Sequence, residues 1–466
     1  MPSHKLLSAP PIGIDAAIQN HRDLSPLSEQ YCRFLQGRSD LNQEFDLGHM
    51  APVLLQWGLT QRASLLIDEA FNAKLDEACR SAGELLSSLP RRVCQADAEL
   101  ATRFWGLTNI EVARQVLLEA GGYEDEYYRV DLIYGETGFK AIELNSGPRA
   151  SGFYASEWLS CYAGFAPTAA FLAEHGQRLT CRDPRLDLLG HVLSRAQRLP
   201  ALRDGAALNV FFSIAEQATV PMQAYLDGML GALPAALTGR VRLFAGQRAD
   251  LAVGPDGVSV DGVAMHALIL GESGLTRALF DARQRNQVLL FDTPTSYFSL
   301  DKRNFALATS LRQDGWFSTT ECEQLDRLLP WTALMLPGPV RFEGVWHDLR
   351  ALALEQRARW VLKSQRGHGG EGVLVGNFTD ACAWQAAIDR YLGEPDWILQ
   401  EFFPSKPFVM LDKGQGLTQH DVVWGVFVFG GMTSGGTIRT KLSADTDGVI
   451  NVSRQSHEGL YCIHGN

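Results

Sequence analysis

The sequence predicts an α+β protein, and three changes of pattern along the chain support that prediction. Helical periodicity dominates residues 26–122. Two strand-like runs then flank a turn at 135–138, and short buried strands alternate with helices over 208–292. From about residue 300, helices give way to a strand-rich end. Separate helical and strand segments beside one βαβ stretch are typical of mixed folds with several sheets.

A helical N-terminal region is predicted over residues 1–125. Residues 1–25 contain Pro10-Pro11 and few periodic apolar positions, so we expect an irregular arm there. The run Ala63–Phe71 carries apolar residues at three- and four-residue intervals, as one face of a helix requires. Glu111–Ala120 repeats that pattern and stops at two glycines, which suit a helix end.

Residues 126–207 begin with a predicted β-hairpin. The strand-like runs 128–134 and 139–145 lie on either side of Gly135-Glu-Thr-Gly138, a turn-rich link. Helical segments are expected after the hairpin, near 154–176 and 185–199.

Residues 208–300 alternate between short apolar strands and helices. Strands are expected at 208–214, 241–244, 267–270 and 287–291, with helices at 222–233 and 275–285. This βαβ rhythm predicts a small parallel sheet. The glycine-containing run 251–263 is expected to form an inserted hairpin.

Residues 301–466 complete the predicted elements. Helices are expected at 301–313, 320–329, 346–357 and 380–391, and strands at 359–363, 372–375 and 397–402. The remainder is strand-rich.

Composition limits the classes of function. The formal net charge is −11 and no large basic block is present, which argues against nucleic acid or an anionic membrane as the main partner. The eight cysteines are scattered and form no CxxC pair, so reduced thiols in the cytoplasm are expected. The N-terminus lacks a signal-peptide pattern, and no apolar stretch reaches the length of about 18 residues that a membrane span needs.

A glycine-rich loop, Gln365–Gly372, follows a strand that ends at Lys363. Its GxGxxG pattern continues into a strand, whereas a dinucleotide fingerprint needs a helix there. The chain has no Gly-Lys-Ser/Thr Walker tripeptide and no Asp-Phe-Gly kinase element, and its His-Arg-Asp at 21–23 lies far upstream. Glycines let backbone N–H groups close over phosphate oxygens, and a lysine adds a fixed cation. The pattern therefore suits a phosphate-binding loop, with an ordinary glycine turn as the alternative.

The predicted hairpin carries a candidate metal site. Glu143 and Asn145 are two residues apart, so they share a strand face, and a hairpin register can bring Asp131 beside them. Three oxygen ligands on a rigid strand pair suit Mg²⁺. Arg129 shares the strand face of Asp131.

The glycine loop and the hairpin together resemble the two halves of an ATP-grasp active site, with the second half moved to the front. The stretch from Thr437 to Asn451 resembles the one that precedes the metal hairpin in unpermuted members, yet no Asp…Glu-x-Asn hairpin follows it. The candidate hairpin lies at 131–145 instead. The chain thus resembles the circularly permuted ATP-grasp ligases, a glutathionylspermidine-synthase-like branch of that superfamily.

That resemblance implies an architecture for the whole chain. Residues 126–207 would hold the hairpin part of a permuted ATP-grasp core. Residues 208–300 would form a Rossmann-like pre-ATP-grasp domain, and residues 301–466 the nucleotide-binding part with its glycine-rich lid loop.

The resemblance also implies roles for individual residues. ATP would be bound by Lys302, Lys363, Gln365, Gly367, His368, Gly369, Gly370, Gly372, Gln400, Glu401 and Phe402. Glu401 would be the ribose acid, with Phe403 beside the adenine pocket. Two magnesium ions would be bound by Asp131, Glu143 and Asn145, and Asn451 would complete metal or phosphate contacts. Arg129 and Arg439 would act on the transferred phosphoryl group and its developing charge, and Arg149 and Ser151 would bind a substrate carboxylate.

The activity that the resemblance implies is ATP-dependent joining of a carboxylate to an amine. A small-molecule or peptide acid would become an acyl phosphate, and the amine would displace phosphate to give an amide and ADP. An ATP-dependent kinase or phosphotransferase on the same scaffold is the alternative, and a nucleotide-binding regulatory protein without turnover is a third hypothesis. The oligomeric state and the identities of the acid and the amine stay open.

Overall fold

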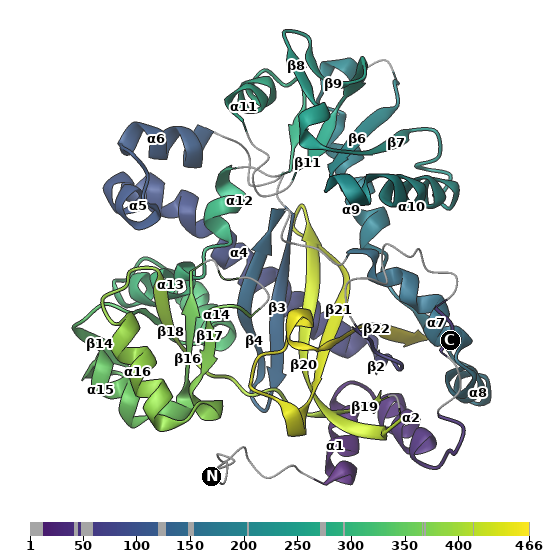
Figure 1. Cartoon of the computed structure of the whole chain (residues 1–466), viewed down its shortest axis with the longest axis vertical. Helices are drawn as coiled ribbons and strands as arrows, with labels where there is room; N and C mark the ends of the chain where they lie inside the picture. The colour runs from purple at the N-terminus through teal and green to yellow at the C-terminus, as the bar shows by residue number, and fades with distance from the viewer. Residues whose placement is uncertain are drawn as a thin grey trace.

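The computed structural model describes residues 13–41, 45–47, 59–119, 127–147, 153–202, 205–270, 276–291, 294–365, 367, 370–412 and 414–465 of the 466-residue chain. The fold is α+β with several sheets, as the sequence predicts. A nine-stranded sheet lies at the centre (Figure 1). A parallel sheet, in teal, lies above it, and a four-stranded antiparallel sheet, in green, lies to its lower left.

The central sheet joins the predicted hairpin to the end of the chain. Its main path has the order β1-β22-β21-β20-β3-β4, and β2, β5 and β19 pair at its sides. The hairpin strands β3 (Tyr127–Gly135) and β4 (Gly138–Ser146) are antiparallel, and β3 also pairs with β20 (Gly416–Phe429). The remaining strands are β1 (Leu59–Thr60), β2 (Leu65–Ile67), β5 (Arg178–Thr180), β19 (Phe408–Asp412), β21 (Met432–Leu442) and β22 (His457–Gly465).

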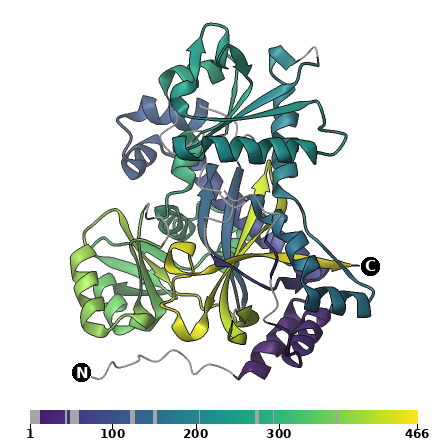
Figure 2. The same cartoon turned by 45° about the vertical axis from the view of Figure 1, so that its right-hand side comes forward.

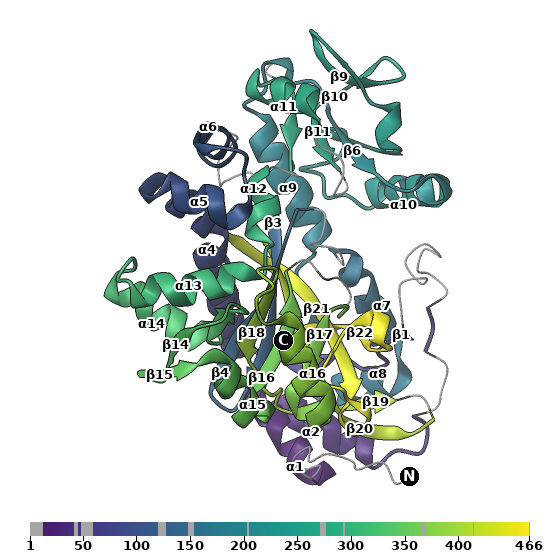
Figure 3. The same ribbon diagram turned by 60° about the vertical axis from the view of Figure 1, so that its left-hand side comes forward.

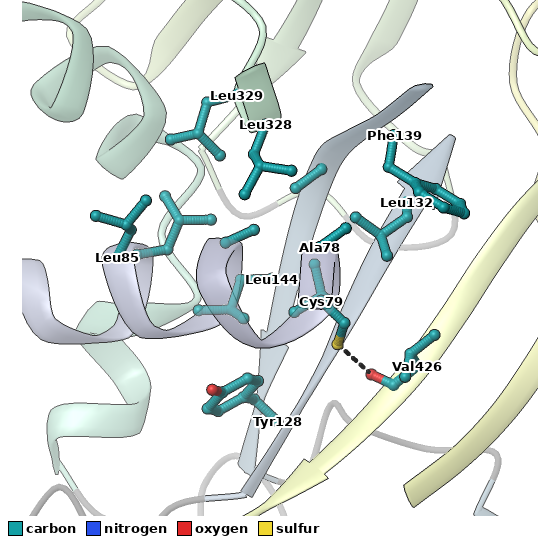
Figure 4. Close-up of a cluster of buried hydrophobic side chains, with 14 of the residues drawn as sticks. Ala78, Cys79, Leu85, Tyr128, Leu132, Phe139, Leu144, Leu328, Leu329 and Val426 are labelled. Atoms are coloured by element: carbon teal, nitrogen blue, oxygen red, sulfur yellow. Dashed lines mark hydrogen bonds between the residues drawn. The ribbon is translucent and has the colours of Figure 1, made fainter. Parts of the chain in front are cut away.

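One face of this sheet is covered by α4 (Glu69–Ala96), a helix of 28 residues. Asp68 caps its first turn by accepting a hydrogen bond from the N–H of Phe71. Alternate residues of β3 and β4 pack on the helix, and Cys79 Sγ donates to the carbonyl of Val426 (Figure 4). A Cβ at Gly83 would overlap the ring of Tyr128, so the absence of a side chain lets helix and sheet approach closely.

The opposite face carries the polar side chains of the hairpin and, at one end, a second apolar core. That core includes Tyr162 and Phe171 from helices that follow the hairpin and Phe427 from β20. These helices are η5 (Phe153–Glu157), α7 (Trp158–Gly164), α8 (Ala166–Glu174) and α9 (Pro184–Ala196), on the right-hand side of the molecule (Figure 2). The helical prediction for this segment is confirmed.

The predicted βαβ stretch forms a four-stranded parallel sheet with the order β12-β11-β6-β7. Its elements are β6 (Leu208–Ser213), α10 (Thr219–Gly231), β7 (Val241–Gly246), β11 (Ala267–Ile269), α11 (Arg277–Gln284) and β12 (Leu289–Leu290). The insertion is larger than the predicted hairpin, because β10 (Val263–Met265) pairs beside β9 (Gly257–Val260) and β8 (Ala252–Gly254). Figure 3 shows this insertion at the far end of the molecule.

The second half of the chain builds an antiparallel sheet with the order β13-β18-β16-β17. These strands are β13 (Thr332–Leu334), β16 (Trp360–Ser364), β17 (Val373–Val375) and β18 (Trp397–Glu401). The helices are α12 (Pro294–Ser299), α13 (Arg303–Gln313), α14 (Thr319–Leu328), α15 (Leu349–Glu355) and α16 (Ala381–Tyr391). The helix predicted from 346 begins only at Leu349, because β15 (Val345–Asp348) pairs with β14 (Pro339–Phe342) instead.

Two predictions for the N-terminal region are wrong. Leu65–Ile67 is a strand rather than part of a helix, because it pairs with the distant Tyr461–Ile463 of β22. Residues 1–12 of the expected arm lie outside the described residues, but α1 (Ile14–Asn20) and the following η1 (His21–Asp23) are helical. Buried His21 holds this turn to β19 by accepting a hydrogen bond from the N–H of Val409.

The other helical elements among the described residues of this region are α2 (Pro26–Gln36), α5 (Ala98–Trp105), α6 (Ile110–Arg114) and a π-helical turn at Gln115–Glu119. Within the described part of the chain, no helix has both the length and the apolarity of a membrane span.

Candidate active site

A cleft lies where the central sheet meets the antiparallel sheet. Its cavity volume is about 90 Å³, below the roughly 300–1,000 Å³ of typical small-molecule pockets, so a nucleotide would need the cleft to open. Its apolar lining comes from Ile133, Val361, Val375, Val423, Phe402, Phe403 and Val449. Its polar lining comes from Asp131, Glu143, Lys302, Lys363, Gln400, Glu401, Arg439 and Asn451. Most of the predicted site residues are therefore brought together from segments that are far apart in the sequence.

Lys363, at the end of β16, spans the cleft. Its Nζ donates to Gln400 Oε1 at 2.7 Å, on the neighbouring β18, and to the carbonyl of Ile142 at 3.2 Å, on the hairpin. The pKa of Lys363 is lowered to about 8, mainly by burial and also by the nearby charge of Lys302, while Glu143 and Asp131 oppose this shift. The antiparallel sheet thus presents a desolvated cation directly to the hairpin.

Lys302, in the turn before α13, makes a second connection across the cleft. Its Nζ lies 2.9 Å from Glu143 Oε1 and donates to the carbonyl of Gly367 at 2.8 Å. The side chain is only 5% exposed, so this ammonium is largely shielded from water. One cation therefore connects the hairpin, the glycine loop and α13.

The register of the hairpin sets the positions of its acids. Asp131 lies directly opposite Glu143, and Arg129 lies opposite Asn145, with a β-bulge just after Asp131. Burial raises the pKa of Glu143 and the charge of Lys302 lowers it, with a net pKa below the usual range. The Glu143 side chain is 30% exposed and faces the cleft, so it is accessible to a ligand.

Asp131 is enclosed by positive charge. It accepts hydrogen bonds from Arg129 Nε at 2.8 Å and from Asn145 Nδ2 at 3.0 Å, and Arg439 Nη2 lies 2.6 Å from its Oδ2. Burial by itself raises the pKa of Asp131, but the two guanidiniums outweigh it and hold the pKa at about 2. The carboxylate is therefore ionised throughout the pH range in which the protein would work.

A glycine on β20, Gly425, leaves the space that the side chain of Arg129 occupies. Gly425 is paired with Asp131 on one side and Thr437 on the other. A Cβ at this position would lie 3.0 Å from Arg129 Cδ and 3.1 Å from Thr437 Oγ1. The Arg129 side chain thus lies over the backbone of Gly425.

The described residues of the glycine loop are in contact with both halves of the site. Besides the bond from Lys302 to Gly367, Gln365 Nε2 donates to Asp301 Oδ2 at 2.7 Å, and Arg454 Nη2 donates to the carbonyl of Gly370 at 3.2 Å. Gly370 and Gly372 have positive φ angles of 77° and 67°, which glycine adopts without strain. Lys302 and Arg454 thus hold the described part of the loop from two sides.

Four predicted residues lie outside the described part of the chain: His368 and Gly369 of the glycine loop, and the predicted substrate residues Arg149 and Ser151.

The predicted adenine side is formed by β18 and the residues after it. Gln400 is 1% exposed and bridges Lys363 to Thr332, so it orients the lysine. Phe402 lines the cleft. Glu401 also lines it, but its Oε1 accepts a hydrogen bond from Arg359 Nη2 at 2.9 Å. A ribose hydroxyl at Glu401 would share the carboxylate with that arginine.

The donor set at the hairpin fits magnesium only in part. The predicted ligands are two carboxylates and an amide, whereas the described residues contain no group of three or more His, Cys, Asp or Glu side chains arranged around a metal position. Glu143 has an accessible carboxylate of the kind that Mg²⁺ prefers. Asp131 is instead bonded to both arginines and to Asn145, so a metal ion there would have to displace one of them.

Sequence reasoning missed four residues of this site. Asp301 and Arg454 hold the loop, Gly425 opens the space for Arg129, and Glu458 lies opposite Arg439 on the next strand. Asp301 stands next to Lys302 in the sequence, which is a weak local signal. The other three are recognisable only from strand pairing and packing.

Comparisons with known proteins agree with this fold. No protein-family model and no curated protein matches the sequence. Among solved structures, the chain is similar to a glutathione synthetase-like effector of Globodera pallida in its apo form, with a TM-score of 0.54 and 12% identity over 94% of this chain and 97% of that one. A putative γ-glutamylcysteine synthetase of Methylobacillus flagellatus KT gives a TM-score of 0.39 and 12% identity, over 81% and 87% of the two chains. The chain therefore shares the overall fold of the glutathione synthetase-like effector.

Proposed function

We propose that the protein is an ATP-dependent carboxylate–amine ligase that forms an amide through an acyl phosphate. The observation that carries the proposal is the position of Lys302, whose ammonium lies between Glu143 of the hairpin and Gly367 of the glycine loop. Cations at that junction suit a triphosphate, because its oxygens can replace the carbonyl and the carboxylate as partners. The apolar walls beside Gln400 suit an adenine ring.

The residues of the chain have separate tasks in this proposal. Lys363 and Lys302 bind phosphate oxygens, and backbone N–H groups of Gly367, Gly370 and Gly372 cover them. Glu143 is the principal ligand for magnesium, with Asn145 beside it, and bound Mg²⁺ would neutralise phosphate charge. Catalysis here is positioning and charge stabilisation rather than covalent chemistry by a side chain.

Arg129 and Arg439 both bond to the carboxylate of Asp131. Both are held rigid by that carboxylate, so they need little reorganisation when negative charge develops nearby. In the proposed reaction they face the transferred phosphoryl group and the tetrahedral intermediate that precedes the amide.

The chain order supports a permuted connectivity as part of this proposal. The hairpin comes first in sequence, yet β3 pairs with β20 from the end of the chain. In the proposed domain scheme, residues 126–207 and 301–466 together make the ATP-grasp core, and residues 208–300 form the pre-ATP-grasp domain.

Product analysis tests the proposal. Purified protein is incubated with ATP, Mg²⁺ and a mixed pool of amino acids, peptides and small carboxylic acids, and the products are identified by mass spectrometry. We expect an amide together with equal amounts of ADP and phosphate. A phosphorylated acceptor with no free phosphate would indicate the kinase alternative. ATP binding without turnover under all substrate mixtures would indicate a regulatory protein.

A further inference from the structure

Glu458, on β22, is a carboxylate of the site that has no role in the reaction described above. It lies directly opposite Arg439 of β21, so both side chains project from the same face of the central sheet. This is also the face of Asp131 and Arg129. The helix η5 packs on β21 and β22 beside it. Glu458 is thus on the far side of the two arginines from Lys302 and Lys363.

Glu458 is largely buried, but its carboxylate oxygens are not fully enclosed by protein. The residue is 9% exposed, and its side chain forms no hydrogen bond or ion pair with any residue that the structure describes. Arg439 and Arg129 are near enough to stabilise it electrostatically, and both also bond to Asp131. Burial raises the pKa of Glu458, with the two arginines opposing the shift.

A buried carboxylate without donors is costly in free energy unless a ligand supplies them. An ammonium group suits this position, since it offers three N–H donors and a compensating charge. A ligand with an anionic group does not suit the position beside Glu458, because the carboxylate would repel it. Along the sheet, β22 with Glu458 and the hairpin strand β4, whose residues contact the two lysines, lie on opposite sides of β21, β20 and β3.

We propose that Glu458 is the specificity residue for the amine substrate, and that it binds the cationic nitrogen of that substrate through hydrogen bonds from its N–H groups. This inference rests on the ligase function proposed above. It assigns the amine subsite to the face of β21 and β22 beside η5, whereas the acid and ATP occupy the side of the two lysines. The amine substrate is therefore one that reaches the enzyme as a protonated ammonium, and one of its protons passes to the Glu458 carboxylate before the nitrogen lone pair attacks the acyl phosphate.

The test separates binding of the amine from activation of the acid. The acid and the amine found by the product screen are used, and hydroxylamine, which is uncharged near neutral pH, serves as the second nucleophile. In Glu458→Gln we expect the KM for the amine to rise about tenfold or more, from the loss of a charge-assisted contact. Formation of the hydroxamate should stay within about twofold of wild type, because acyl phosphate formation does not involve Glu458.

Further variants show whether the effect is one of charge rather than folding. Glu458→Asp keeps the charge and should recover part of the affinity for the amine, and Glu323→Gln, on the exposed surface of α14, should leave both reactions unchanged. Glu458→Gln should melt at or above the wild-type temperature, because it removes an unpartnered buried charge. An equal loss of amide and hydroxamate, or an unchanged KM for the amine, would overturn the assignment. Absence of hydroxamate from the wild-type enzyme with every acid would overturn the ligase function and this inference together.

Discussion

The ammonium of Lys302 lies 2.9 Å from Glu143 Oε1 and so connects two segments that are 159 positions apart in the chain (302 − 143). The same nitrogen donates to the carbonyl of Gly367. In the proposed function, this cation between an acid of one sheet and the glycine loop of another would contact the triphosphate of ATP. This relationship gives the following predictions.

Replacing Lys302 with Met should weaken binding of ATP with Mg²⁺ by about ten- to hundredfold, since hydrogen bonds to charged groups contribute about 1.5–3 kcal/mol each. Isothermal titration calorimetry measures the change. Lys74→Met, at an exposed position of α4, is the matched control and should bind as wild type does. Equal affinities in the two variants would show that Lys302 does not contact the nucleotide.

Glu143→Gln should lower the turnover number by about a hundredfold or more, since a few kcal/mol of transition-state stabilisation is lost with the charge of the metal ligand. The substitution keeps the size of the side chain, so circular dichroism and the melting temperature should change little. Glu111→Gln, exposed on α6, controls for the loss of one carboxylate. A Glu143→Gln enzyme with near wild-type turnover would rule out the metal assignment.

The depressed pKa of Lys363, about 8, gives a prediction for pH. Between about pH 8 and its unfolded value, the folded protein binds fewer protons at this lysine than the unfolded chain does, so its contribution to stability rises with pH. The variant Lys363→Met has no ionisable group at this position and so lacks this pH-dependent contribution to stability. The variant should therefore be more stable than wild type below pH 8, and the difference should shrink toward pH 10.5, as followed by melting temperatures. A difference that is constant with pH would contradict the buried position of the ammonium.

Gly370→Ala should weaken ATP binding because the new Cβ would lie 2.5 Å from Val449 Cγ1 and push the loop away from its partner. The control is Gly414→Ala, which has a similar φ of +83° but open space around the Cβ. Both variants carry the same backbone strain, so only the contact differs. Calorimetry should show a loss of affinity for Gly370→Ala alone.

Gly83→Ala should destabilise the fold by about 1–3 kcal/mol, the usual cost of overpacking a core, because the Cβ would overlap the ring of Tyr128. Gly190→Ala on α9 has open space and should be neutral or stabilise by up to about 1 kcal/mol, as expected for alanine in a helix. Urea denaturation of both variants measures the free energies of unfolding. Destabilisation of the same size at both positions would mean that the contact with Tyr128 is not the cause.

Local patterns explain which elements could be predicted from the sequence. The hairpin 127–146 and the parallel strands of 208–290 carry their signal in residue alternation and in turn residues, which act over a few positions. The strand Leu65–Ile67 is different, because a short apolar run has no distinct period and its partner on β22 is almost four hundred residues away. The same reason explains the site: Lys363 and Glu143 belong to recognisable motifs, whereas Glu458 and Gly425 gain their roles only when β20, β21 and β22 pair.

Transfer of a carboxylate oxygen to phosphate tests the central claim most directly. The acid substrate is labelled with ¹⁸O in its carboxylate, and the phosphate released with ADP is analysed by mass spectrometry. An acyl phosphate intermediate requires one labelled oxygen in each phosphate released, and this is the result that we predict. Phosphate without the label, or a labelled acid recovered intact beside a phosphorylated acceptor, would contradict the ligase mechanism.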